Sequence, residues 1–186
     1  GQLRLELGPS KSDAAASVVK LIVDVLGFWD LDQKKYGFFA TLRDSKIATI
    51  DITGGLIVFG DYGDHPQFIL AAGGFNPRFT DIPPEAKASV DRLGSSFKVG
   101  RFSLKMTGYF ALTPGTIQAG FDIAASASIG PVGLKGELGF DVIVYRDPQT
   151  HFIAVFRFSA AITYSGHTLA CVSVTGTIEV PRAWHI

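Results

Sequence analysis

The chain has 186 residues, of which 47% are hydrophobic and 18% are charged. This composition excludes intrinsic disorder, and the length suits a single β domain. The 17 basic and 17 acidic residues cancel, so nucleic acid is not expected as a partner. The single cysteine, Cys171, cannot form an internal disulfide, and no run of about 18 apolar residues predicts a membrane-spanning helix.

The first half of the chain is predicted to be mostly β. Residues 1–17 are interpreted as an N-terminal extension, in which residues 12–16 have the polar cap of a helix start. The β-branched residues that follow favour a strand at residues 18–30. Further strands are predicted at residues 36–43, 46–60 and 67–72, separated by turns rich in Asp, Gly and Ser.

Residues 75–100 interrupt the strand pattern. Prolines break the alternation there, and residues 84–93 fit a short helix that begins at a proline and ends at Gly94. An irregular stretch of this length within a sheet is typical of a lid or plug. The lid is predicted to contain Phe75, Phe79 and Leu93.

Five long alternating segments occupy the second half of the chain. Successive side chains on a strand point to opposite faces, so each segment has one apolar and one polar side. Short turns make neighbouring strands antiparallel. We therefore predict one all-β domain at residues 1–186, a long-stranded antiparallel meander curved into a barrel, a half-barrel or a two-layer sheet. The segments lie at residues 102–112, 117–127, 132–144, 152–164 and 170–180.

A search for catalytic chemistry returns little. The sequence contains no Gly-rich phosphate loop, nucleophile elbow or paired-cysteine zinc spacing, so we predict no catalytic residue, metal or cofactor. Asp61, Asp64 and His65 share one turn, but a calcium ion needs more oxygen ligands than this turn supplies. The charges on the polar sides of the long segments are interpreted as cross-strand pairs. They are Lys105, Asp122, Lys135, Glu137, Asp141 and Arg157.

The apolar face needs a cover, and four covers are considered. The sheet can close into a dense core, or its interior or groove can hold a lipid or another apolar molecule beneath the lid. Alternatively the face can contact a bilayer, or pack against neighbouring domains of a longer protein. The predicted ligand-binding residues are Phe102, Met106, Phe110, Phe121, Leu138, Phe140, Phe156 and Phe158.

We favour a non-enzymatic domain that binds a hydrophobic ligand such as a lipid. The alternative is a structural scaffold or protein-interaction module of a larger protein. A membrane-inserting barrel or pore is disfavoured, because the strand ends show no aromatic girdles and long polar loops are scarce. The sequence does not indicate a compartment.

Several short motifs follow one another along the chain in a specific order and spacing. They are Arg43-Asp44-Ser45-Lys46-Ile47, Ile52-Thr53-Gly54, Gly73-Gly74-Phe75-Asn76-Pro77-Arg78-Phe79, Gly108-Tyr109-Phe110-Ala111-Leu112-Thr113, Leu138-Gly139-Phe140-Asp141 and Trp184-His185. Together these motifs resemble the DUF6603 family, a domain of unknown function in large microbial proteins. The resemblance extends from about Val23 to the C-terminus, and departs from the family in the acidic residues 81–85. It implies an excerpt of a longer β-rich protein, whose other domains are candidate partners, and it implies no activity.

Overall fold

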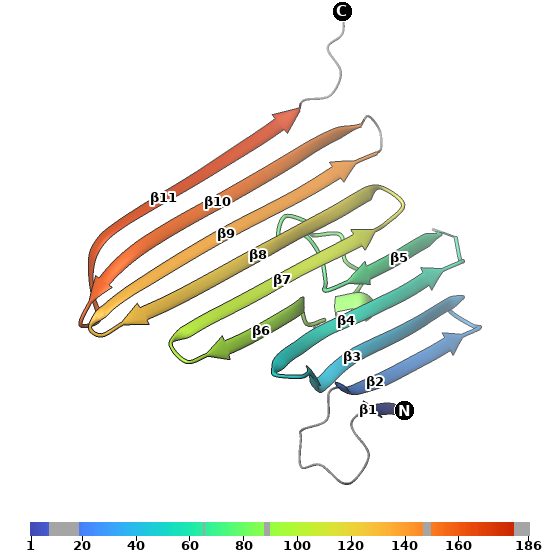
Figure 1. Ribbon diagram of the computed structural model, residues 1–186. Helices are drawn as coiled ribbons and strands as arrows, with labels where there is room; N and C mark the ends of the chain where they lie inside the picture. Colours follow the sequence, from blue (N-terminus) through green and yellow to red (C-terminus); the bar gives the residue numbers. More distant parts are fainter. Residues whose placement is uncertain (8–18, 65, 88–89, 147–149, 181–186) are drawn as a thin grey trace, which may run out of the picture.

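The computed structural model describes residues 1–7, 19–64, 66–87, 90–146 and 150–180. They form one antiparallel sheet of 11 strands, so the all-β fold class is confirmed (Figure 1). The helix start considered at residues 12–16 lies outside the described residues. The strands are β1 (Gln2–Leu7), β2 (Val19–Asp30), β3 (Lys35–Ile47), β4 (Ile50–Asp61), β5 (Gln67–Ala72), β6 (Leu93–Val99), β7 (Phe102–Leu112), β8 (Thr116–Ile129), β9 (Val132–Tyr145), β10 (His151–Tyr164) and β11 (His167–Val180).

The sheet follows the chain order with one interruption. Its strand order is β1-β2-β3-β4-β5-β7-β8-β9-β10-β11, and β6 pairs with both β4 and β7. Strand β5 pairs with the end of β7, and β6 with the rest of it, so these two short strands lie end to end between β4 and β7. Among the described residues β1 and β11 do not pair with each other, so the sheet is open and has two edges.

The five long strands form where the alternating pattern predicts them. Their hairpins are short because the turn residues permit it: Gly130, between β8 and β9, has φ 59°. This left-handed conformation favours glycine, which lacks a Cβ. The long strands are paired without a register shift from β7 through β10.

The helix predicted at residues 84–93 is absent from the described residues. A single 3₁₀ turn occupies Pro84–Lys87, and Leu93 already begins β6, opposite Gly108 of β7. Arg92 donates hydrogen bonds to the carbonyls of Gly73 and Phe75, which fixes the chain just before β6. These tertiary contacts outweigh the local helical preference.

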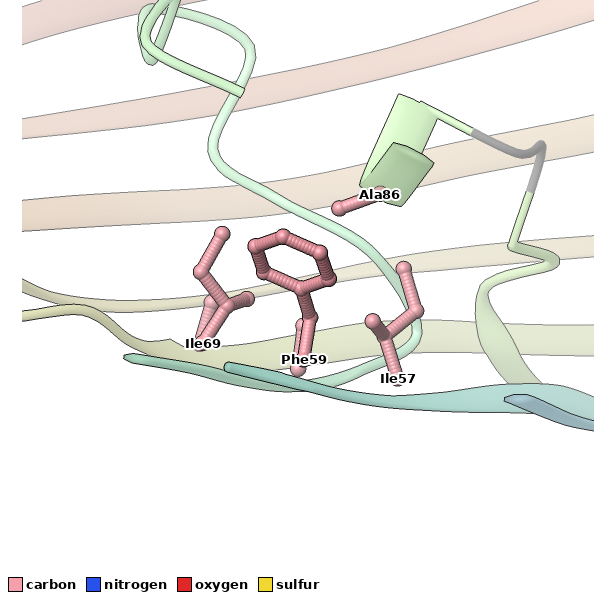
Figure 2. Close-up of a cluster of buried hydrophobic side chains, with 6 residues drawn as sticks. Ile57, Phe59, Ile69 and Ala86 are labelled. Carbon is pink, nitrogen blue, oxygen red and sulfur yellow. The ribbon is translucent and has the colours of Figure 1, made fainter. Parts of the chain in front are cut away.

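The buried hydrophobic core is small and lies on one side of the sheet. It consists of Ile57 and Phe59 of β4, Ile69 and Ala71 of β5, Ala111 of β7, and Ala86 from the 3₁₀ turn. Figure 2 shows Ala86 lying above the side chains that rise from the sheet. The connection between β5 and β6, residues 73–87 and 90–92 among those described, therefore covers this part of the sheet; we call it the covering segment.

Candidate functional site

The strand register places all eight predicted ligand-binding residues on one face of the sheet. Phe121 lies opposite Phe140, which lies opposite Phe156 on the next strand. The rings of Phe121 and Phe140 are in contact, with centroids 5.9 Å apart. A second row joins Met106, Ile123, Leu138 and Phe158 across four strands. We call this side of β7–β11 the apolar face.

The apolar face is open and carries no full charge. Among the described residues of β7–β11, no Asp, Glu, Lys or Arg side chain lies on it. Its phenylalanines are 40–43% exposed at Phe102, Phe110, Phe121, Phe156 and Phe158. The described residues of the chain therefore leave this surface uncovered, although the sequence analysis expected a cover over it.

The three predicted lid residues separate in the structure. Phe75 and Phe79 belong to the covering segment, where their rings stack at 5.8 Å, and Phe75 packs on the small core. That core includes Ala111, whose side chain points away from the apolar face because it alternates with Phe110. Leu93 instead begins β6 opposite Gly108, on the apolar face. The covering segment thus lies on the face opposite the predicted ligand residues, which we call the polar face.

A hydrogen-bonded cluster crosses the polar face from β7 to β10. The Tyr109 hydroxyl donates to Asp141 at 2.7 Å, and Arg157 donates to Asp141 at 2.6 Å and to Asp122 at 3.0 Å. The guanidinium of Arg92 lies 3.9 Å from the centre of the Tyr109 ring. The cluster confirms two of the predicted cross-strand charge pairs, those that Arg157 makes.

Two glycines make room for this cluster. A Cβ at Gly139 would lie 2.5 Å from Asp122 Oδ1 and 2.9 Å from Arg157 Nη2, and a Cβ at Gly120 would clash with Tyr109 and Asp141. Burial, and then the hydrogen bond to Asp141, raise the pKa of Tyr109 far above its usual range. The hydroxyl therefore keeps its proton and acts as a donor within the cluster.

The sheet holds the covering segment by polar contacts as well as by its core. The backbone N–H of Asn76 donates to Oε1 of Gln118 at 2.9 Å, and Gln118 is completely buried. Nε2 of Gln118 donates in turn to Thr116 at 2.8 Å. At the other end of the core, Lys35 forms an ion pair with Glu85 at 2.7 Å. The sequence reasoning missed Gln118 and Asn76, because an alternating strand treats a glutamine as merely solvent-facing.

With this geometry described, the family can be decided. The model of a family of unknown function, DUF6603, matches residues 1–184. The chain belongs to the DUF6603 family. No curated protein and no solved structure matches this DUF6603 chain.

The polar face of this DUF6603 domain contains a hollow of about 440 Å³. Its lining includes Lys105, Asp122, Glu137, Arg157 and Ser159. Asp122 and Arg157 are paired with each other, and Ser159 donates to Glu137 at 3.4 Å. Four of these five side chains are therefore hydrogen-bonded to one another.

Metal ions and membrane-spanning helices were considered separately. Within the described ranges, no three His, Cys, Asp or Glu side chains gather closely enough to hold a metal ion. No helix in the part of the chain that the structure describes is long and apolar enough to cross a membrane. Cys171 is exposed on β11.

Proposed function

We propose that this DUF6603 domain is a non-enzymatic lipid-binding module whose apolar face accepts the acyl chains of membrane lipids. The observation that carries the proposal is the uncharged face of β7–β11, where the phenylalanines remain about 40% exposed. The ligand surface is thus an open face and not the interior or groove expected from the sequence, because the hollow described above lies on the polar side.

The size of the face supports a bound partner. An aromatic side chain has roughly 150–250 Å² of surface, so each phenylalanine at about 40% exposure leaves roughly 60–100 Å² in contact with water. Adding the aliphatic neighbours brings the patch to on the order of 800 Å². The largest apolar patch on a typical monomer is about 300–600 Å². The neighbours included are Met106, Leu138, Ile162, Val172, Val174 and Ile178.

The chemistry of the face favours acyl chains over a transient protein partner. A protein interface makes about one hydrogen bond per 100–200 Å². In the described residues of β7–β11, the apolar-face side chains with hydrogen-bonding groups are Tyr164 and His167, both at the β10–β11 turn. Acyl chains need no hydrogen bonds, so a lipid loses nothing on this surface whereas a protein partner forgoes its polar contacts.

The dimensions of the face match the apolar layer of a bilayer. At roughly 3.4 Å per residue, the segment from Phe102 to Leu112 is about 34 Å long and the segment from Ile117 to Ile129 is about 41 Å long. At a strand tilt of about 40° these lengths project to about 26 Å and 31 Å, compared with an apolar band of about 25–30 Å.

Aromatic side chains occur near both ends of the strands, although the sequence did not reveal girdles. At the β2–β3 end, Trp29 stacks on Tyr36 with centroids 5.5 Å apart. At the opposite end, Phe97 contacts Phe102 at 5.7 Å, and Tyr164 is half exposed. Trp and Tyr favour the interface between lipid and water. This distribution removes one of the two arguments that disfavoured a membrane.

Vesicle flotation with the full chain tests the proposal. The wild-type protein should float with neutral phosphatidylcholine vesicles, whereas Phe121→Asp and Phe156→Asp should remain at the bottom because each places a charge against acyl chains. The matched control is Lys135→Asp, which introduces the same side chain on the polar face and should float normally. Far-ultraviolet circular dichroism establishes that each variant is folded.

Two outcomes would overturn the lipid proposal. If the folded Phe121→Asp and Phe156→Asp variants float as well as wild type, the apolar face is not the binding site. If wild type fails to float and native mass spectrometry with organic extraction finds no bound lipid, the scaffold function takes its place. The exposed edge of β11 is the observation that favours that second function.

A further inference from the structure

Strand β11 is a long edge with one neighbour. Its 14 residues, His167–Val180, pair with β10, and all of them are exposed except Gly176, which is half buried. In an antiparallel ladder every second residue of an edge strand points its N–H and C=O groups away from its neighbour. About seven residues of β11 therefore present unpaired backbone groups along the side of the sheet.

The sequence of β11 lacks the features that normally protect an edge. Natural edges are short or carry lysine, proline or bulges that prevent further pairing. β11 contains no proline and no basic Lys or Arg, and its only acidic residue is Glu179. The one register shift lies at its very beginning, beside Ile162 and Thr163 of β10. Nothing within the remaining 11 or so residues blocks a further strand.

We propose that β11 pairs with β11 of a second copy of this chain, antiparallel and about a two-fold axis perpendicular to the sheet. Such an axis reverses the strand direction but keeps the same face of the sheet uppermost. Residues that point to the apolar face in one copy therefore lie opposite residues that point to the apolar face in the other, and the same holds for the polar face. Val172, Val174 and Ile178 then extend the apolar face across the junction, and Ser173 and Thr175 extend the polar face. Each Glu179 lies far from its symmetry mate when the axis is near Ser173.

The other edge of the sheet fits β11 less well. Strand β1 has six residues, so a head-to-tail pair between β11 and β1 would leave more than half of β11 unpaired. A second β11 matches the full length of 14 residues. A closed two-fold pair also ends the assembly at two copies, whereas head-to-tail pairing would continue into a filament.

This inference does not depend on lipid binding, and its test is made in detergent micelles that cover the apolar face. Cys171 is the only cysteine, so the wild type already carries a single thiol on β11. Two further single-cysteine proteins carry Ser173→Cys or Thr175→Cys together with Cys171→Ser. Side chains directly opposite in a ladder have Cβ atoms about 4.5–5.5 Å apart. A short bismaleimide reagent should therefore cross-link one of these three positions to itself efficiently. The control is Lys135→Cys in the same background, on β9 and two strands from the edge, which should not be cross-linked.

A charge swap at the proposed axis sharpens the test. Ser173→Lys and Ser173→Glu should each weaken self-association by about tenfold or more in sedimentation equilibrium, because like charges then meet across the pair. An equimolar mixture of the two variants should recover association. Circular dichroism establishes that both remain folded.

The inference fails if wild type sediments as a monomer in detergent, or if neither charge at position 173 alters a dimer that does form. It also fails if none of the three β11 positions cross-links above the Lys135→Cys control. Flotation with vesicles in the same preparations is scored separately, so loss of pairing and loss of lipid binding are distinguishable.

Discussion

Removing the carboxylate of Asp141 should destabilise the domain by about 1.5–4 kcal/mol. Asp141 is 5% exposed and accepts hydrogen bonds from both Tyr109 and Arg157. In Asp141→Ala the buried Tyr109 proton loses its acceptor, which costs about 1–3 kcal/mol. The Arg157 side chain is 42% exposed and retains Asp122, so its loss is screened by water and adds about 0.5–1 kcal/mol.

A double-mutant cycle separates this cluster from general packing. Tyr109→Phe removes the hydroxyl but leaves Asp141 paired with Arg157, and should cost about 1 kcal/mol. The double variant contains no orphaned hydroxyl. It should therefore be more stable than the sum of the single effects predicts, by about 1–2 kcal/mol.

Urea unfolding in a mild detergent, followed by circular dichroism, measures all four proteins. The comparison rests on midpoints and on equal slopes, which indicate that the unfolded states are comparable. If the two single effects simply add within about 0.3 kcal/mol, Tyr109 and Asp141 do not interact and the cluster is not a unit.

Three further changes test how the polar face is built. Gly139→Ala should cost about 0.5–1 kcal/mol, because its Cβ displaces the partly exposed ion pair between Asp122 and Arg157. Gly136→Ala on the same strand, whose nearest neighbour is 3.9 Å away, should change thermal stability little; equal effects of the two would refute the steric argument. Phe59→Ala should cost about 3–5 kcal/mol and speed protease cleavage within the covering segment, since Phe59 is 1% exposed; unchanged cleavage would count against its anchoring role. The hydrogen bond from Lys35 lowers the pKa of Glu85 below its ordinary 4.5, so its stabilisation is present above pH 4.5 and is lost as the pH falls through the lowered value. The protection factors of the covering-segment amides, which correct exchange for its intrinsic pH dependence, should therefore fall on acidification, and Glu85→Gln should remove that part of the fall; an unchanged fall in the variant would contradict it.

The long strands could be predicted because their alternation is strict and their turns are marked by Gly and Pro. The register then places the eight predicted residues on one face, as period-two patterning requires. The pairing of β6 was missed, although Leu93, Phe97 and Val99 alternate with Gly94, Ser96 and Lys98. The prolines before it suggested an irregular segment, and nothing local reveals that β5 and β6 share the same two neighbours, β4 and β7.

The location of the covering segment was not foreseen, because the sequence argument assigned the cover to the apolar face. The local signal lies in β4, where Leu56, Ile57, Val58 and Phe59 follow one another and so break the alternation of apolar and polar residues. Continuous apolar runs are typical of strands buried on both faces. The cover follows that signal and lies on the polar face over Ile57 and Phe59. Its polar anchor Gln118, on β8, carries no comparable mark in sequence.

The buried polar groups of the polar face are paired with one another. In the described part of the chain, no buried side-chain nitrogen or oxygen lacks a hydrogen-bond partner. Arg157 and Asp141 neutralise each other, and the covering segment fills the small core. The apolar face and the β11 edge are incomplete in different ways: the first lacks apolar contacts and the second lacks hydrogen bonds. Acyl chains can cover the first, whereas water or another strand can satisfy the second. Lipid bound to the apolar face would therefore leave the β11 edge accessible to a strand partner.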